Sequence, residues 1–207
     1  MYPKPLQKLI ALFARFPGIG PKQATRFAFF VLKENHSFSQ ELMATLREIK
    51  EAITICNQCF RTMSRENGTE FCSLCRDPKR DQNLIIVVEK ESDLQNLEKT
   101  GAHQGLYHVL GGVISTLDSE SPKRLRLKGL YERVKMVTEK ENSSEVILAT
   151  NPTTEGDTTA LYIEKILSPL REKFSIKISR LGRGLSLGSE LEYADENTLK
   201  NALTNRK

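Results

Sequence analysis

The sequence contains no apolar run long enough to span a lipid bilayer, and its N-terminus lacks the layout of an export signal. An apolar stripe is present near the N-terminus, but Lys8 and Arg15 interrupt it. We therefore expect a cytoplasmic protein with no membrane partner. Cysteine is also scarce, with four residues in a chain of 207. In a reducing compartment such thiols favour metal binding over disulfides.

Two other kinds of site are missing from the sequence. The three histidines, His36, His103 and His108, show no metal-ligand spacing, so we expect them on the surface or in the core. The glycine-rich stretch around Arg183 lacks the Gly-Lys-Ser/Thr ending of a phosphate-binding loop, so it predicts no nucleotide site.

The positive charge is concentrated in the N-terminal part of the chain. Residues 1–80 hold 13 Lys and Arg against 7 Asp and Glu, whereas residues 81–207 hold 18 against 19. A basic module joined to a near-neutral one suggests a polyanionic partner for the first. Ordinary solvated lysines would give the same count, so charge alone leaves both interpretations open.

The apolar patterns predict an α+β chain of several modules. Residues 1–54 carry apolar side chains at helical spacing, and residues 55–80 hold all four cysteines with little apolar content. Residues 81–176 alternate short apolar runs with helical patterns, which predicts a mainly parallel sheet covered by helices. Residues 177–207 predict a C-terminal strand, loop and short helix.

The cysteines follow the pattern C-x2-C, twelve residues, C-x2-C, and they are Cys56, Cys59, Cys72 and Cys75. Each C-x2-C turn brings two sulfurs to one ion, and two such turns complete a tetrahedron. Four thiolates leave no position for water, so the pattern predicts one structural Zn²⁺ per chain that supplies much of the folding energy of this segment. The alternative is four unrelated buried thiols.

The stretch "RFPGIGPKQATRFAFF" predicts a tight turn between two helices. Gly18 and Gly20 allow the turn, and Pro21 suits the first turn of a helix. The free N–H groups at that helix start favour an anion, and Lys22 and Arg26 lie four residues apart on the same helix face. This is the arrangement of a helix-hairpin-helix, which grips DNA phosphates without reading base sequence. A plain glycine-rich link between two helices is the alternative.

Acidic positions of the α/β segment resemble those of the Toprim domain of topoisomerases and bacterial primases. Glu89 follows the strand pattern "LIIVV", and the loop "ATNPTTEGD" follows a later strand. The resemblance places Asn151 and Thr153 where the two metal-binding aspartates of the Toprim pattern stand. Neutral side chains supply far less charge for Mg²⁺, so the sequence predicts a Toprim scaffold without its catalytic acids.

Two other roles stay open for these acids. Glu89 together with Glu155 or Asp157 could still hold a weakly bound ion. Glu89 could also serve simply as a helix-capping acid.

The order of modules resembles the RecR family of bacterial recombination mediators over essentially the whole chain. The stretches that carry the resemblance are "FPGIGPKQATRFAF", "CNQCF", "CSLC", "VVE", "YHVLGGVIS", "ATNPTTEGDTTALYI" and "RLGRGLSLGSELEYADENTL". It implies a DNA-repair accessory protein that is not an enzyme, works at the nucleoid with RecO and RecF at single-strand gaps, and helps load RecA. It also implies a ring-like tetramer with subunit contacts through the tail.

By the same resemblance, specific residues receive roles. Lys22 and Arg26 would contact the DNA backbone, and the Toprim face with Glu89, Glu155 and Asp157 would be the candidate surface for RecO. Two other functions compete with this one. The chain could be a metal-dependent Toprim enzyme, which the missing aspartates disfavour. It could also be a zinc-containing DNA-binding protein without RecO or RecF partners, which leaves the α/β segment unexplained.

Overall fold

The structure is a computed structural model that describes residues 2–65, 68–185, 188 and 190–206. The chain divides into two compact units, Met1–Thr54 and Ile55–Lys207. Within the described residues, no helix is both long enough and apolar enough to cross a membrane.

The N-terminal unit is helical. Its helices are α1 (Lys4–Phe13), α2 (Pro21–Lys33) and α3 (His36–Ala52). Pro21 stands at the first position of α2, where its missing N–H costs nothing. The side chain of Asn35 begins α3 by accepting a hydrogen bond of 2.9 Å from the N–H of Phe38.

The cysteine module, residues 55–80, has short elements. A two-stranded sheet pairs β1 (Ile53–Ile55) with β2 (Thr62–Ser64), and the one-turn helix α4 spans Ser73–Arg76. In the described part of this module the buried apolar residues are the cysteines Cys56, Cys59 and Cys72. The module therefore has little core beyond its own thiols.

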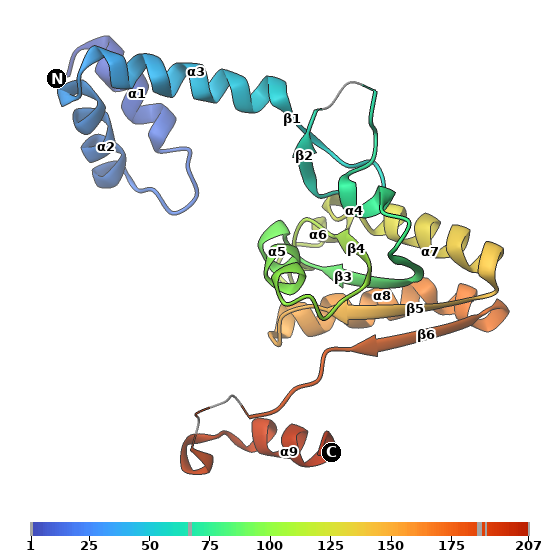
Figure 1. Cartoon of the computed structure of the whole chain (residues 1–207). Helices are drawn as coiled ribbons and strands as arrows, with labels where there is room; N and C mark the ends of the chain where they lie inside the picture. The colour runs from blue at the N-terminus through green and yellow to red at the C-terminus, as the bar shows by residue number, and fades with distance from the viewer. Residues whose placement is uncertain (1, 66–67, 186–187, 189, 207) are drawn as a thin grey trace. The chain divides into compact units, whose positions relative to one another are not determined.

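A four-stranded parallel sheet organises the rest of the second unit (Figure 1). The strand order is β4-β3-β5-β6, and every described pairing is parallel. The sequence prediction of an α/β domain with a mainly parallel sheet is confirmed. The elements are β3 (Asp81–Val88), α5 (Glu91–Lys99), β4 (Gly105–Val109), α6 (Ser121–Arg124), α7 (Leu127–Glu141), β5 (Ser143–Ala149), α8 (Thr154–Lys173) and β6 (Ser175–Arg180).

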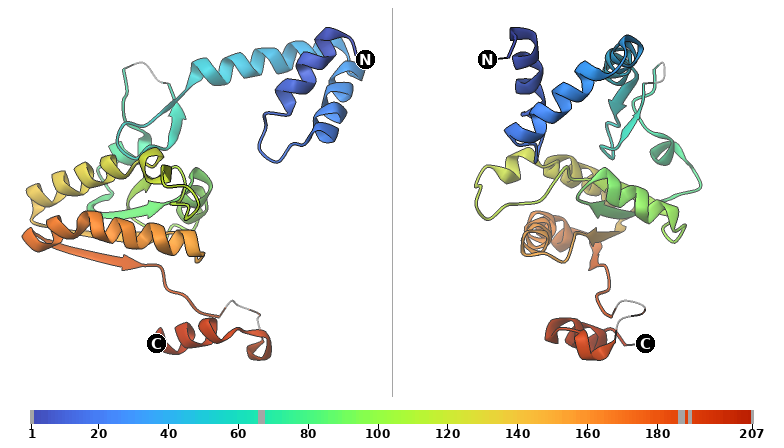
Figure 2. Two further views of the ribbon diagram at one scale, coloured as in Figure 1. Left: turned by 180° about the vertical axis from the view of Figure 1, so that it is seen from behind. Right: turned by 90° about the vertical axis from the view of Figure 1, so that its left-hand side faces the viewer.

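Helices cover both faces of this sheet. Alternate residues of β3 point to opposite faces, so Ile85 and Val87 join one apolar cluster and Ile86 and Val88 join another. The first cluster is completed by α7 and α8, which lie side by side along one face (Figure 2). The second cluster includes Leu94 of α5. A double-sided core of this kind fixes the sheet rigidly enough to position residues at its carboxyl edge.

The C-terminal segment begins with β6, which is the last strand of the sheet. β6 pairs with β5 as far as Arg180, so the strand continues past residue 176, where the sequence pattern suggested a boundary. Beyond it the structure describes a short 3₁₀ helix (Leu191–Tyr193) and α9 (Glu196–Thr204). The Asp195 side chain caps α9 by accepting hydrogen bonds from the N–H groups of Asn197 and Thr198.

The packing of α7 against the core predicts that two substitutions on this helix change the free energy of unfolding by different amounts. Leu130 is buried in the first cluster, whereas Met136 is exposed. We expect Leu130→Ala to lower the free energy of unfolding by about 2–5 kcal/mol, because it leaves a cavity. Met136→Ala should cost below about 1 kcal/mol. Urea unfolding followed by circular dichroism measures both, and equal losses would contradict this description of the core.

Candidate functional site

The four cysteine sulfurs lie together. Cys56 follows β1, Cys59 ends the next turn, Cys72 precedes α4 and Cys75 lies within it. Their sulfur atoms all lie within 4.8 Å of one another. Four thiolates around a zinc ion at about 2.3 Å would stand about 3.8 Å apart, so this cluster fits a tetrahedral metal. The donor set could therefore hold a metal ion, as the C-x2-C spacing predicts.

Hydrogen bonds and packing hold the cluster in shape. The N–H of Cys72 donates to the sulfur of Cys56 at 3.3 Å. Cys56, Cys59 and Cys72 are buried, and Cys75 is partly exposed. The closed geometry offers no open position for a substrate, which suits a structural rather than a catalytic centre.

The turn before α2 presents an uncompensated helix N-terminus. Gly18 has a φ of +75°, a conformation that L side chains rarely adopt, and Gly20 is the extended N-cap residue. The first turn of α2 contains no acidic residue. Lys22 and Arg26 are exposed, and neither forms an ion pair with another described residue. The arrangement predicted from "PGIGPK" is therefore present in the N-terminal unit.

Glu89 lies at the carboxyl edge of the sheet, where the direction of the chain changes. From β3 the chain crosses to β4 on one side, whereas from β5 it crosses to β6 on the other. Open α/β sheets place their sites at such a switch point. Glu89 directly follows β3. The strand β5, which pairs with β3, leads into the β5–α8 loop, residues 150–153. The structure thus places Glu89 and the β5–α8 loop at the same edge of the sheet.

Asn151 donates two hydrogen bonds to the carboxylate of Glu89. The backbone N–H of Asn151 donates to Oε1 at 2.7 Å, and its side-chain Nδ2 donates to Oε2 at 2.6 Å. Glu89 is 3% exposed, so these bonds compensate for its burial. In this arrangement both carboxylate oxygens of Glu89 accept a hydrogen bond from Asn151.

Thr153 and Gly156 shape the start of α8. The Thr153 hydroxyl accepts a hydrogen bond of 3.1 Å from the N–H of Gly156 and so caps the helix. A Cβ on Gly156 would stand 2.1 Å from the carbonyl oxygen of Asn151. Glycine therefore allows the loop to fold back closely enough for Asn151 to reach Glu89.

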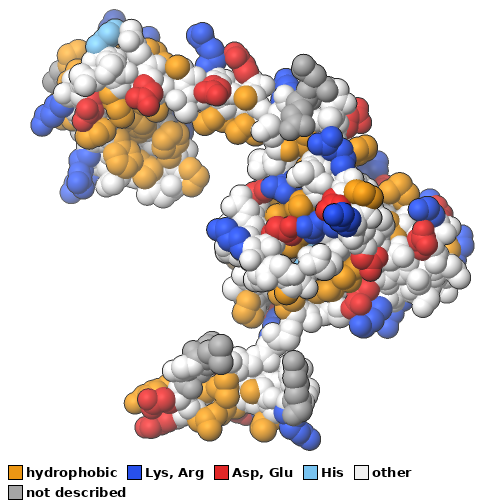
Figure 3. Space-filling model, viewed as in Figure 1, with side chains coloured by type: hydrophobic (Ala, Val, Ile, Leu, Met, Phe, Trp, Pro, Cys, Tyr) orange, Lys and Arg blue, Asp and Glu red, His pale blue; other side chains and the backbone are white. Residues whose placement is uncertain are grey.

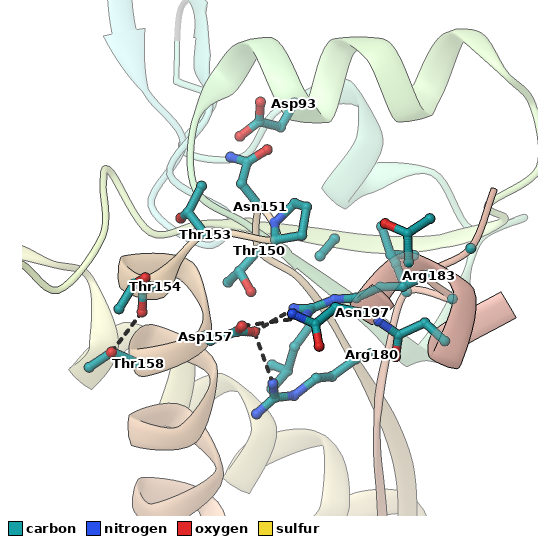
Figure 4. Close-up of a pocket in the computed structure, with 18 of the residues that line it drawn as sticks. Asp93, Thr150, Asn151, Thr153, Thr154, Asp157, Thr158, Arg180, Arg183 and Asn197 are labelled. Carbon is teal, nitrogen blue, oxygen red and sulfur yellow. Dashed lines mark hydrogen bonds and ion pairs between the residues drawn. The ribbon is translucent and has the colours of Figure 1, made fainter. Parts of the chain in front are cut away.

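Asp157 is paired with two arginines, one at the end of β6 and one in the segment that follows it. Its carboxylate forms an ion pair with Arg180 at 3.3 Å and another with Arg183 (Figure 4). The hydrogen bond from Arg183 holds the pKa of Asp157 below its ordinary value, so the carboxylate is charged at neutral pH. A cavity of about 1140 Å³ adjoins these groups and the β5–α8 loop.

Sequence reasoning missed the partners of these acids. It identified Glu89 and Asp157 but not the roles of Asn151, Arg180 or Arg183, which come from separate elements. Glu155 lies in the first turn of α8, is partly exposed, and its carboxylate has no hydrogen bond or ion pair among the described residues. The sequence could have suggested Asn151 only as a replaced metal ligand.

The histidines divide as the sequence suggested, between surface and core. His36 is exposed and His103 is partly exposed, whereas His108 is fully buried on β4. Burial lowers the pKa of His108 to about 3, so its ring is neutral and its Nε2 donates to the carbonyl of Arg126 at 3.0 Å.

Family models match three parts of the chain. The model described as "RecR, helix-hairpin-helix" matches residues 6–50, and that described as "Toprim domain" matches residues 83–182. The model described as "RecR, C-terminal" matches residues 184–207. The fold and these matches define a protein that joins a helix-hairpin-helix to a Toprim domain through a four-cysteine module.

Relatives named "Recombination protein RecR" align with nearly the whole chain. The protein of Cutibacterium acnes is 45% identical over 206 residues, covering 100% of this chain and 96% of the relative. A Prochlorococcus marinus protein is 44% identical and covers 99% and 96%. The Myxococcus xanthus protein is 41% identical and covers 100% and 99%. The chain belongs to the RecR family.

The Glu89–Asn151 contact predicts how the stability of the protein changes when Asn151 is replaced by aspartate. In Asn151→Asp, a second carboxylate would face Glu89 and the amide donor would be lost. We expect the free energy of unfolding in EDTA to fall by about 1–3 kcal/mol, with part of the loss recovered in Mg²⁺. Thermal unfolding with EDTA or Mg²⁺ measures this effect.

Two controls make this comparison specific. Gln95→Glu adds the same charge at an exposed position of α5 and should behave like the wild type. The wild type itself should show no change in melting temperature with Mg²⁺. An Asn151→Asp variant as stable as wild type in EDTA would show that the contact with Glu89 contributes little.

Proposed function

We propose that this protein is a non-enzymatic mediator of recombinational DNA repair. It clamps DNA at single-strand gaps and acts with RecO and RecF to promote RecA loading on DNA coated by single-strand-binding protein. The observation that carries the proposal is that both carboxylate oxygens of Glu89 accept hydrogen bonds from Asn151. A Toprim enzyme needs such a carboxylate for its metal, and here a neutral amide holds it.

The DNA contact lies in the helix-hairpin-helix of the N-terminal unit. The exposed N-terminus of α2 offers free N–H groups to a phosphate, and Gly18 and Gly20 let the backbone approach closely. Lys22 and Arg26 add positive charge beside that point. Contacts of this kind read the backbone, so binding is independent of base sequence.

The metal of the cysteine module is one structural Zn²⁺ per chain. Four sulfur ligands favour zinc over oxygen-seeking cations, and the sulfur atoms already lie within 4.8 Å of one another. The ion orders a module with little other core, and it takes no part in a reaction.

The apolar surface of the N-terminal unit supports a homo-oligomer. The buried residues of its described helices are Ala24 and Ala28, whereas large apolar side chains are exposed and gather on the helices (Figure 3). They include Leu12, Phe30, Leu32, Met43 and Leu46 on the helices, and Phe16 in the turn before α2 is exposed as well. Subunit contacts would bury this surface, and a ring tetramer in the cytoplasm, at the nucleoid, is the assembly we propose.

We expect the DNA contacts to appear in the salt dependence of binding. Lys22→Ala with Arg26→Ala should weaken binding to all DNA sequences alike and flatten the slope of log affinity against log salt by about one unit per lost contact. Lys50→Ala removes an exposed charge from α3 of the same unit and should change little. Fluorescence anisotropy on gapped and duplex DNA measures the slope.

The same protein also tests whether the Toprim domain cleaves DNA. Gapped and supercoiled DNA should be shifted but intact in both Mg²⁺ and EDTA. Nicking or relaxation that requires Mg²⁺ and disappears in Glu89→Ala would overturn the non-enzymatic function. A binding loss confined to one DNA sequence would overturn the backbone contact.

The partner surface for RecO is the Toprim face around the start of α8. Of the three acids predicted there, Glu89 is buried against Asn151 and Asp157 is paired with arginines. Glu155 is the partly exposed acid whose carboxylate makes no ion pair with a described residue, and it is the strongest candidate.

Charge reversal at this position is the corresponding test. Glu155→Lys should weaken RecO binding about 30-fold or more, since breaking a buried charge pair at an interface costs about 2–5 kcal/mol. Glu172→Lys makes the same change at the far end of α8 and should bind normally. Calorimetry with purified RecO measures both, and unchanged affinity for Glu155→Lys would remove this residue from the interface.

A further inference from the structure

The cysteine module is joined to the edge strand of the Toprim sheet by the backbone itself. β4 is the outer strand in the order β4-β3-β5-β6, so one side of it lacks a neighbouring strand. The N–H of Val109 on this strand donates to the carbonyl of Cys59 at 2.8 Å. The chain segment that carries a predicted metal ligand therefore satisfies part of an otherwise open sheet edge.

Phe60, the next residue, anchors the same contact. It has a φ of +62°, which is strained for an aromatic residue. Its ring lies edge-on to His108 with centroids 5.2 Å apart, and the Arg126 guanidinium lies 5.4 Å from the ring centroid. A Cβ on Gly129 of α7 would stand 2.6 Å from the ring, so glycine makes room for it. Packing on three sides holds Phe60 in its unusual backbone conformation.

Arg133 of α7 reaches from the sheet to the cysteine cluster. Its side chain is buried, and Nη1 donates to the carbonyl of Tyr107 on β4 and to that of Gln58 at 3.4 Å. The other terminal nitrogen, Nη2, lies 3.7 Å from the sulfur of Cys75. One guanidinium group thus touches the edge strand, the first C-x2-C turn and a predicted metal ligand of the second.

The charge of the proposed centre explains why a buried arginine stands here. Four thiolates around a divalent ion carry a net charge of about −2. Burying such charge is unfavourable unless cations or N–H donors compensate for it. Arg133 supplies a permanent positive charge and an N–H group directed at a sulfur. Groups outside the ligand shell commonly control both the orientation of ligands and metal affinity.

We propose that Arg133 is a positioning residue of the metal centre, which offsets its negative charge and couples the cysteine module to strand β4. The metal then stabilises the edge of the Toprim sheet as well as its own loops, and the two parts lose structure together. The inference rests on the metal centre described under the proposed function, and it does not depend on DNA or RecO binding.

The first experiment measures zinc release from Arg133 variants. Purified proteins are analysed for bound zinc, and release to a chromogenic chelator is followed by absorbance at neutral pH. We expect Arg133→Gln to release zinc about 10–100-fold faster than the wild type, the range seen when groups supporting metal ligands are removed. Arg133→Lys keeps the charge but loses the forked donor group, so its rate should be intermediate.

Lys128→Gln is the matched control, because it removes one positive charge from an exposed position of the same helix. It should release zinc at the wild-type rate. A wild-type rate in Arg133→Gln would overturn the inference while leaving the metal centre intact. A wild-type protein that binds no metal would overturn the metal centre itself, and the inference with it.

Hydrogen exchange in the unmodified chain gives a second test, independent of whether a variant folds. The Val109 amide, which donates to Cys59, should lose protection at least tenfold when the metal is removed by a chelator. The Val146 amide, in the central strand β5, should lose much less. Unchanged protection at Val109 after metal removal would show that the module and the sheet edge are not coupled.

Discussion

The parallel pairing of β3 with β5 is the constraint on which the centre of this protein depends. Val88 lies opposite Ala149 in the register, so the residues that follow the two strands must meet at the carboxyl edge of the sheet. A buried carboxylate there needs a partner. In a Toprim enzyme that partner is a metal ion, and here it is the amide of Asn151. At this edge the side chains of the β5–α8 loop therefore decide what the buried carboxylate contacts.

A second candidate site lies in the N-terminal unit. The N-terminal unit presents a helix N-terminus whose first turn holds no acid, with two cations that form no ion pair among the residues the structure describes, an arrangement suited to phosphate. The Toprim domain contributes a rigid platform, since both faces of its sheet are packed with apolar side chains. Membership of the RecR family and the match to its helix-hairpin-helix model support a recombination repair protein whose N-terminal unit is a DNA-binding domain.

The cysteine module shows how a segment with little core can still be held firmly. Its thiols form one cluster, and its neighbours Cys59 and Phe60 contact the edge strand β4. An open strand edge and a buried cluster of negative ligands are both unfavourable alone. In this structure the Cys59 carbonyl accepts a hydrogen bond from the N–H of Val109 on the edge strand, and Arg133 contacts both the strand and the cluster.

The sequence by itself determined the modules, the cysteine cluster and the glycine turn, because these depend on spacing and on local backbone preferences. Its resemblance to the Toprim pattern also placed Asn151 at the position of a metal-binding aspartate. Only the tertiary structure decided what Asn151 does instead, because Glu89 is 62 positions away in the chain and meets it through strand pairing. The role of Arg133 depends likewise on contacts with Gln58 and Tyr107 from distant elements. Residue patterns record local geometry, whereas a buried charge and its partner are brought together by the packing of the whole domain.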